Sequence, residues 1–164
     1  MELHAFNTLS AEAAAEVVRP WANVSGWVDA IVAGRPYGDL GQLVAVADIG
    51  ARAWTAADVE GALAHHPRIG ERVAGSGAEQ DLSRAEQASI GERDHEVDAA
   101  IAAGNASYEE RFGRVFLIRA KGRTAPEILE NLAARLDHDD ATEIAVVTDE
   151  LRQIALLRLE GTFS

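Results

Sequence analysis

The histidines at positions 65 and 66 are the side chains of this sequence best suited to acid–base chemistry. They open the stretch HHPRIGER, at the expected end of a helix. A histidine there meets the negative end of the helix dipole, which favours the charged imidazolium. Pro67 has no backbone N–H and turns the chain, so the ring of His66 can point away from the helix. His66 is therefore either an acid–base group at a site or a polar residue in a helix-ending turn.

Ser83 and Glu86 belong to the stretch SRAEQ and have two interpretations. Ser-x-x-Glu is the pattern of a capping box, in which serine caps a helix and glutamate reaches back to it. Alternatively, both groups face a ligand at the start of a helix, where backbone N–H groups also gather. The two interpretations compete for Glu86, because a carboxylate engaged in capping cannot also orient a base.

Several arginines could bind a carboxylate or a ureido group. Arg158 is the most informative, because the stretch LLRL surrounds it with apolar residues, and a charge in such a stripe needs a partner or a ligand. The other candidates are Arg68, Arg72 and Arg119.

Two weaker patterns would indicate a metal site. Glu92 and His95 form Glu-x-x-His, half of a di-iron site, but the sequence holds no second copy. The order of residues 65–66, 138–139 and Asp149 resembles that of all-helical, metal-dependent phosphohydrolases. Acidic residues are abundant in this chain, however, so we expect no metal site.

The composition excludes several classes of function. Without cysteine there can be no disulfide, thiol catalysis or thiolate metal site. A net charge of −12 argues against a nucleic-acid partner. No apolar run approaches the roughly 20 residues that cross a bilayer, and MELHAFNTLS does not look like a signal peptide. Glycine-rich phosphate loops and nucleophile elbows are also absent from the sequence. We therefore expect a cytoplasmic protein that binds a small molecule.

The elements that must position these residues are predicted to be helices. Alanine is frequent and aromatic residues make up only 5% of the chain, which favours helices over strands. We expect residues 1–164 to form one compact all-α domain, a bundle of six to eight helices. Helical patterns cover residues 10–18, 39–54, 55–65, 83–104, 105–116, 124–136 and 141–159, with a short segment at 21–34.

Local signals predict where some helices begin and end. Ser10 is an expected N-cap, and Thr124 opens a second capping box with Glu127. Pro67 should end the preceding helix at residue 65 or 66, and glycine should end another at Gly104. Residues 75–82 are expected to form a loop. The apolar run VFLIRA (115–120) is ambiguous between a strand and a buried helical turn.

Taken together, these stretches resemble the 2-oxo-4-hydroxy-4-carboxy-5-ureidoimidazoline (OHCU) decarboxylases, which act last in the route from urate to allantoin. The resemblance rests on HHPRIGER, on SRAEQASI, and on two longer blocks, and it spans nearly the whole chain in the expected order. The longer blocks are GNASYEERFGRVFLIRAKGRTAPEIL (104–129) and NLAARLDHDDATE followed by LRQIALLRL (131–159).

The resemblance implies a role for particular residues. His66, which precedes the proline, would be the catalytic histidine, and Glu86, which precedes glutamine, its catalytic partner. His65 departs from the family pattern and is either a second proton-handling group or an ordinary helix-end residue facing solvent, and we favour the latter. The substrate would be bound by Pro67, Ser83, Ile118, Arg119 and Arg158, with Arg152 as the alternative to Arg158 if the last helix has another register.

The resemblance also implies an all-helical homodimer that needs neither a metal nor another cofactor. Loss of CO2 leaves a carbanion that the adjacent ring imine can absorb, so the protein has only to orient the substrate and handle protons. His66 would hydrogen-bond the substrate hydroxyl, and Glu86 would orient or charge its ring. The product would be (S)-allantoin. The rival classes are the metal-dependent phosphohydrolase and a non-enzymatic helical interaction module.

Overall fold

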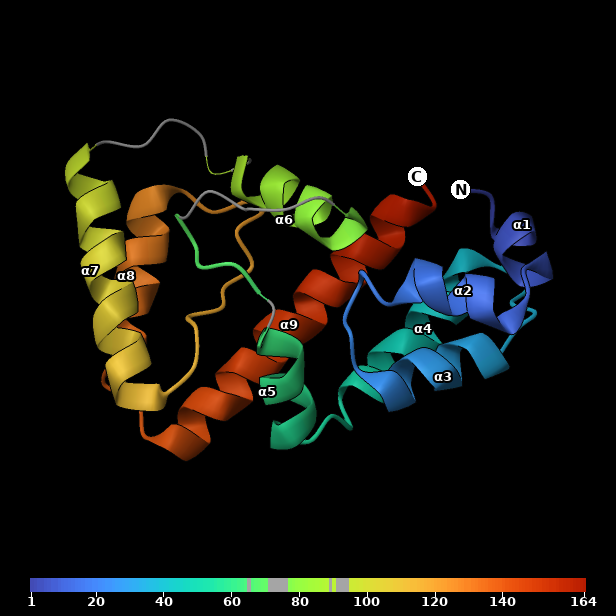
Figure 1. The fold of residues 1–164 in the computed structure, drawn as a ribbon, viewed down its shortest axis with the longest axis horizontal. Helices are drawn as coiled ribbons and strands as arrows, with labels where there is room; N and C mark the ends of the chain where they lie inside the picture. Colours follow the sequence, from blue (N-terminus) through green and yellow to red (C-terminus); the bar gives the residue numbers. More distant parts are fainter. Residues whose placement is uncertain (65, 71–76, 89, 91–94) are drawn as a thin grey trace. The chain divides into compact units, whose positions relative to one another are not determined.

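The described part of the chain is all-α. The computed structural model describes residues 1–64, 66–70, 77–88, 90 and 95–164, and within these ranges it contains nine helices and no strand (Figure 1). The predicted fold class is therefore confirmed, with one short helix at the N-terminus that the sequence pattern did not predict. None of the described helices combines the length and the apolar character that a membrane span requires.

The chain divides into two compact units. The first comprises residues 1–62 and 151–164, and the second comprises residues 63–150. The first unit contains four complete helices, most of a fifth and the end of the last one, namely α1 (Leu3–Thr8), α2 (Ala11–Val18), α3 (Ser25–Ala33), α4 (Leu40–Ala51), α5 (Ala56–Leu63) and α9 (Asp140–Thr162).

An aromatic cluster forms much of the core of the first unit. The rings of Phe6, Trp21 and Phe163 lie within 6.2 Å of one another, measured between centroids, and Trp27 packs edge-on to Trp21. In the same unit the amino group of Met1 donates to the carbonyl of Thr162 over 2.7 Å, which joins the two ends of the chain.

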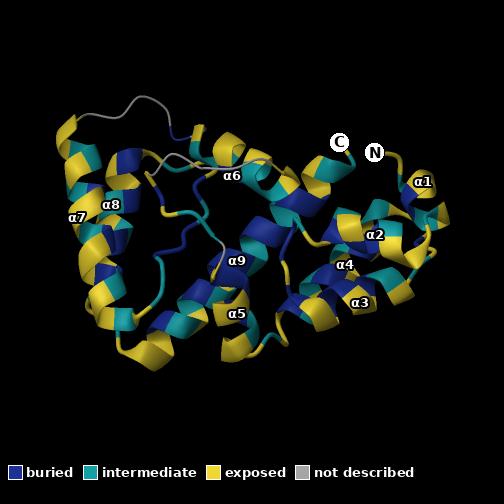
Figure 2. Cartoon of the chain, viewed as in Figure 1, coloured by how far each residue is buried: buried dark blue, intermediate teal, exposed yellow. Residues whose placement is uncertain are grey.

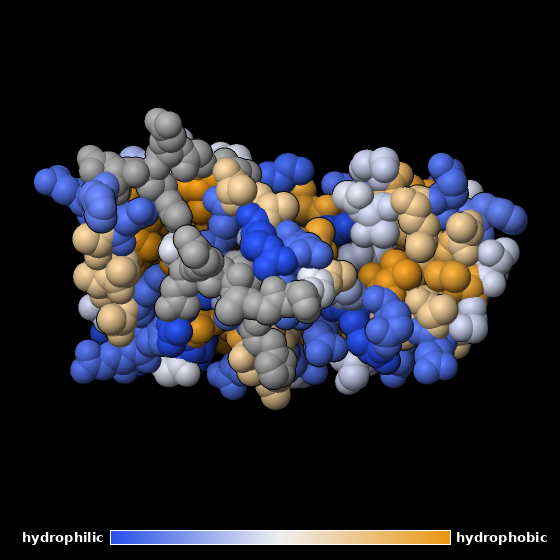
Figure 3. All heavy atoms as spheres, turned by 45° about the horizontal axis from the view of Figure 1, so that its top comes forward, coloured by the Kyte–Doolittle hydropathy of each residue, from blue (hydrophilic) through white to orange (hydrophobic). Residues whose placement is uncertain are grey.

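The second unit holds α6 (Ala78–Ala88), α7 (His95–Phe112), α8 (Ala125–Arg135) and the beginning of α9. Helices α7 and α8 lie side by side, and their facing residues are buried (Figure 2). Hydrophilic side chains cover much of the visible surface in Figure 3, as the acidic composition leads one to expect. The core of this unit consists of Ile69, Ile90, Ile101, Tyr108, Phe116, Ile118, Ala120, Ala125, Ile128 and Leu132.

Two predicted helix starts are confirmed in detail. The hydroxyl of Ser10 accepts a hydrogen bond from the N–H of Ala13. At α8, Thr124 and Glu127 form the complete capping box, with each side chain bonded to the backbone of the other residue. These caps depend only on neighbouring residues, which is why the local sequence could predict them.

Helix α6 differs from the prediction. It begins at Ala78 rather than at Ser83, and the acidic residues Glu79 and Asp81 in its first turn suit the positive end of the helix dipole. It ends at Ala88, and Ile90 lies in a turn, so the predicted continuous helix over 83–104 is wrong. The predicted loop over 75–82 is also wrong from residue 78 onward, whereas residues 71–76 lie outside the described ranges.

Helix α7 also differs, because it runs straight through Gly104, where a helix end was predicted. The glycine is required by packing. A Cβ atom at this position would overlap the side chain of Leu132 on α8. Gly104 therefore allows the close approach of α7 and α8.

The apolar run at 115–120 is neither a strand nor a helix. It is an irregular segment whose residues Phe116, Leu117, Ile118 and Ala120 are buried. Buried backbone groups outside regular structure need partners from elsewhere in the protein. Side chains of α8 and α9 supply some of these partners.

Candidate active site

The segment that carries His66 begins where α5 ends. The helix ends at Leu63, two to three residues before the predicted position, and the N–H of His66 donates to the carbonyl of Leu63 over 2.9 Å. His66 and Pro67 are each half-buried. His65 lies outside the described ranges.

Helix α6 presents the serine and the glutamate on one face. Ser83 is 3% exposed and Glu86 is half-buried, and their three-residue separation places them on the same side of the helix. Because Ser83 is the sixth residue of α6, it is not an N-cap, and the capping-box interpretation of this pair is wrong. The competition for Glu86 is thereby removed.

The side chain of Gln87 joins α6 to the segment after Pro67. Its Nε2 donates to the carbonyl of Arg68 over 3.1 Å, and its Oε1 accepts from the N–H of Gly70 over 3.1 Å. Gly70 has a φ of 87°, which glycine adopts at little cost. One amide group thus connects the stretch beginning at His66 with the helix that carries Glu86.

The irregular segment at 115–120 is bound by side chains on both sides of Ile118. The carbonyl of Leu117 accepts from Nη1 of Arg135 over 2.7 Å, and the N–H of Arg119 donates to Oε2 of Glu150 over 2.6 Å. The N–H of Arg119 is therefore already engaged within the protein. Ile118 is buried between these two anchors.

A buried ionic cluster supports the first of these anchors. Glu143 is fully buried and accepts from Arg135, with Nη2 at 2.6 Å and Nε at 2.8 Å. The hydroxyl of Tyr108 also donates to Glu143, and Nδ1 of His138 lies 2.8 Å from its other oxygen. Burial raises the pKa of Tyr108, and the hydrogen bond to Glu143 raises it further. Each buried charge of the cluster has several partners, which offset the cost of taking it out of water.

The side chain of Arg119 has a buried Nε atom with no hydrogen-bond partner in the part of the chain that the structure describes. A buried guanidinium nitrogen normally has an acceptor. A substrate oxygen could fill that role, as the sequence analysis expected of Arg119.

Arg158 and its alternative Arg152 belong to the first unit, whereas the predicted site residues between positions 66 and 119 belong to the second. Arg158 is 3% exposed, and its Nη1 donates to the carbonyl of Pro20 over 2.9 Å. One partner of this buried charge is therefore a backbone carbonyl of the protein itself. Arg152, the alternative in the last helix, forms an ion pair with Asp48 of the first unit.

The metal-site interpretations gain no support. Among the described side chains there is no group of three or more histidine, aspartate or glutamate residues that could hold a metal ion. His138 is instead part of the cluster around Glu143. Glu92 lies outside the described ranges.

Four residues around the candidate site were not predicted from the sequence, namely Gln87, Arg135, Glu143 and Glu150. A signal for two of them was present in the last helix. Glu143 and Glu150 fall at helical spacing with Val147 and Ile154, so they are acidic residues in an apolar stripe. As at Arg158, a charge in such a stripe needs a partner.

Comparison with known proteins finds similar sequences. The family described as OHCU decarboxylase matches residues 7–160. The 2-oxo-4-hydroxy-4-carboxy-5-ureidoimidazoline decarboxylase of Amia calva is 33% identical over 98% of this chain and 93% of its own length. The enzyme of the same name from Haloferax volcanii is 34% identical over 62% of this chain and 60% of its own length.

The fold is also found among solved structures. The crystal structure of an OHCU decarboxylase in the presence of (S)-allantoin superposes with a TM-score of 0.76, over 90% of this chain and 97% of that one. The two sequences are 23% identical, so this likeness shows the shared fold. An (S)-allantoin synthase has a TM-score of 0.72 at 15% identity, over all of this chain and 54% of that one.

Proposed function

This chain belongs to the OHCU decarboxylase family, carboxy-lyases that convert OHCU to allantoin in urate degradation, and we propose that His66 and Glu86 are its catalytic pair. The observation that carries the proposal is the contact between their two segments. Gln87, next to Glu86, is hydrogen-bonded to the backbone that follows Pro67. The imidazole and the carboxylate thus belong to segments that are held together.

In the proposed reaction, the bond between the ring carbon and the carboxylate breaks, and its electron pair moves into the adjacent ring C=N bond. CO2 leaves, the hydroxyl on the same carbon gives up its proton and becomes the ring carbonyl, and the ring nitrogen and the neighbouring carbon that carries the ureido group each take up a proton. His66 hydrogen-bonds the hydroxyl on the reacting carbon. Glu86 orients the imidazole and stabilises its charged form, as a carboxylate does for a catalytic histidine.

The remaining residues bind the substrate. Ser83 is buried on the same face of α6 as Glu86, and its hydroxyl donates a hydrogen bond to a substrate oxygen. Pro67 and Ile118 provide apolar contact, and Arg119 supplies its guanidinium rather than its N–H, which Glu150 already binds. Arg158 is the second guanidinium of the site, on the strength of the resemblance.

The same resemblance supports four further proposals. The product is the S isomer of allantoin, the enzyme is a cytoplasmic homodimer, and it uses neither a metal nor another cofactor. The ring imine of the substrate serves as the electron sink, so the chemistry requires no added group.

The experiment is an assay of the purified chain on substrate generated from urate in situ, with the formation of allantoin followed by circular dichroism. His66→Gln and Glu86→Ala should each lower kcat by about 10²- to 10⁴-fold, the usual contribution of general acid–base catalysis. The matched controls are His4→Gln in α1, at an exposed position, and Glu79→Ala in α6, at a half-buried position like that of Glu86. A rate for His66→Gln within twofold of the parent would rule out the proposed role.

A further inference from the structure

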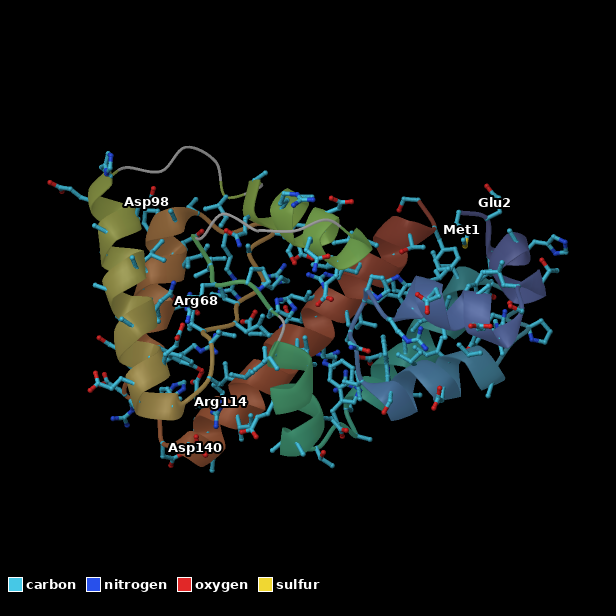
Figure 4. All side chains as sticks on the ribbon, in the orientation of Figure 1. Met1, Glu2, Arg68, Asp98, Arg114 and Asp140 are labelled. Atoms are coloured by element: carbon cyan, nitrogen blue, oxygen red, sulfur yellow. The ribbon has the colours of Figure 1, made fainter. Side chains whose placement is uncertain are left out.

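Two side chains of α7 hold the residues that follow Pro67. Asn105 is 5% exposed, and its Nδ2 donates to the carbonyl of Ile69 over 2.9 Å. One turn further along the helix, Glu109 accepts two hydrogen bonds from Arg68, one of them from Nη2 over 2.8 Å. Arg68 extends toward α7 in Figure 4.

Together with the two hydrogen bonds of Gln87, these contacts bind residues 68–70. Arg68 is bound through its carbonyl and its side chain, Ile69 through its carbonyl, and Gly70 through its N–H. Three consecutive residues are therefore bound, from α6 on one side and from α7 on the other. Such a segment has little freedom to shift, because each movement stretches several hydrogen bonds at once.

The orientation of the Asn105 amide is fixed by its partner. A carbonyl can only accept, so the atom that faces Ile69 must be the amide nitrogen. The amide oxygen is buried without a hydrogen-bond partner in the described part of the chain, beside a cavity of about 350 Å³ that Arg68, Asp98 and Glu109 help to line. Aspartate would fit the same space, but as an anion it would turn an oxygen toward the carbonyl of Ile69.

We propose that Asn105 and Glu109 are positioning residues for the decarboxylation, which fix residues 68–70 and thereby set His66 against Glu86. The inference rests on the proposed function. Pro67 has a fixed φ and stands between His66 and the bound residues, so a shift of the segment moves the imidazole with it. A displacement of about 1 Å in a catalytic group can lower a rate by 10²-fold. Because neither residue is proposed to touch the substrate, the effect falls on kcat rather than on KM.

Asn105→Asp is the decisive variant. At pH 8 the new carboxylate cannot donate to Ile69, and kcat should fall about 10- to 100-fold with KM within about twofold. When protonated, the carboxyl can donate again, so the ratio of the variant's kcat to that of the parent should rise as the pH falls toward about 5. Burial and the nearby carboxylates of Asp98 and Glu109 raise the pKa of the new group, while the charge of Arg68 lowers it.

The ion pair between Arg68 and Glu109 should not disturb this measurement. The hydrogen bond from Arg68 lowers the pKa of Glu109 below its ordinary value of 4.5. A carboxylate with a lowered pKa keeps its interaction above its ordinary pKa and loses it only as the pH falls through the lowered value. Recovery between pH 8 and 5 would therefore come from the group at position 105.

Asn131→Asp is the matched control. The Nδ2 of Asn131 donates over 2.8 Å to the carbonyl of Glu127 within α8, so the same substitution removes the same kind of hydrogen bond and adds the same charge. Its kcat should follow that of the parent at every pH. Parental kcat for folded Asn105→Asp at pH 8, or a loss without recovery in acid, would overturn the inference.

A second pair of variants keeps the test decisive if Asn105→Asp does not fold. Glu109→Gln removes the negative charge that pairs with Arg68, and both side chains of this pair are partly exposed. The control is Glu110→Gln at the next position of α7, which is exposed. We expect kcat to fall about 3- to 10-fold in the first and to stay unchanged in the second. Equal rates would count against the inference alone, whereas a parental rate for His66→Gln would count against the proposed function.

Discussion

At the scale of single residues, the neighbouring side chains Glu86 and Gln87 have different roles in the proposed site. A carboxylate can orient and charge an imidazole, but it cannot donate a hydrogen bond when ionised. An amide can donate one hydrogen bond and accept another, which is why Gln87 can bind the carbonyl of Arg68 and the N–H of Gly70 together. Asn105, on α7, uses only the donor group of its amide, which binds the carbonyl of Ile69.

The ion pair between Arg135 and Glu143 illustrates a different use of buried polarity. The two side chains are 4% and 0% exposed, and Arg135 also stacks over the ring of Phe116 at 4.5 Å from its centroid. A buried pair of this kind adds little net stability, but the loss of one partner leaves an uncompensated charge. Its role here is to fix the carbonyl of Leu117, beside the proposed substrate contacts.

We therefore predict a large cost for Arg135→Met. The free energy of unfolding should fall by about 3–5 kcal/mol, because Glu143 remains buried without its cation. The double variant Arg135→Met/Glu143→Leu should be more stable than Arg135→Met alone, since the carboxylate that had lost its arginine is removed as well. Urea denaturation followed by circular dichroism measures both.

A surface pair provides the comparison. Arg19 and Glu16 form an ion pair at the C-terminal end of α2, with side chains 48% and 67% exposed. Arg19→Met should change the stability by less than about 1 kcal/mol, as is usual for exposed ion pairs. If Arg135→Met/Glu143→Leu proved less stable than Arg135→Met, the uncompensated charge of Glu143 would not be the cause of the stability lost in Arg135→Met.

At the scale of elements, α7 contacts both α8 and the segment after Pro67. One part of its surface packs closely on α8 through Gly104, and Asn105 and Glu109 reach the segment after Pro67. The position of α7 against α8 thus determines how its polar side chains meet that segment. A change in the packing of the two helices should affect both stability and catalysis.

Gly104→Ala tests this dependence. In an exposed helix the change would stabilise by up to about 1 kcal/mol, but here the added methyl overlaps Leu132, and overpacking typically costs about 1–3 kcal/mol. We expect a net loss of stability together with a lower kcat. Thermal unfolding and the coupled assay provide the two measurements.

Gly61→Ala is the matched control for this prediction. It lies in α5, and a Cβ atom built there meets no other atom within 4 Å. This substitution should raise the stability by about 0.5–1 kcal/mol, through helix propensity alone. A gain of similar size for Gly104→Ala would contradict the packing argument.

At the scale of the whole molecule, helix α9 connects the two units. It begins at Asp140 in the second unit and continues without interruption to Thr162 in the first. A continuous helix unfolds cooperatively, and the sequence contains no linker between the units. We therefore propose that residues 1–164 unfold as one domain.

The tryptophans make this proposal testable. All three, Trp21, Trp27 and Trp54, lie in the first unit, whereas the helices of both units contribute to the far-ultraviolet circular dichroism. The two signals should give coincident urea transitions with the same midpoint. A step in circular dichroism without a change in tryptophan fluorescence would mean that the second unit unfolds separately.

The amino-acid sequence by itself determined the helical class, several helix ends and the family. Helix caps such as Ser10 and Thr124 act over three residues, and apolar spacing acts over a few turns, so these signals are complete in the local sequence. The family could be recognised because HHPRIGER and SRAEQ retain their order and separation. The roles of His66 and Glu86 were predicted from those stretches and remain predictions for the assay.

Only the tertiary structure decided how the segments meet. It placed Ser83 inside a helix, made Gly104 a packing contact, and showed that an irregular apolar segment is bound by Arg135 and Glu150. It also joined Asn105 to Ile69 across 36 positions of sequence. A single amide or carboxylate carries no local signal of its distant partner, because its hydrogen bond exists only after the helices have packed.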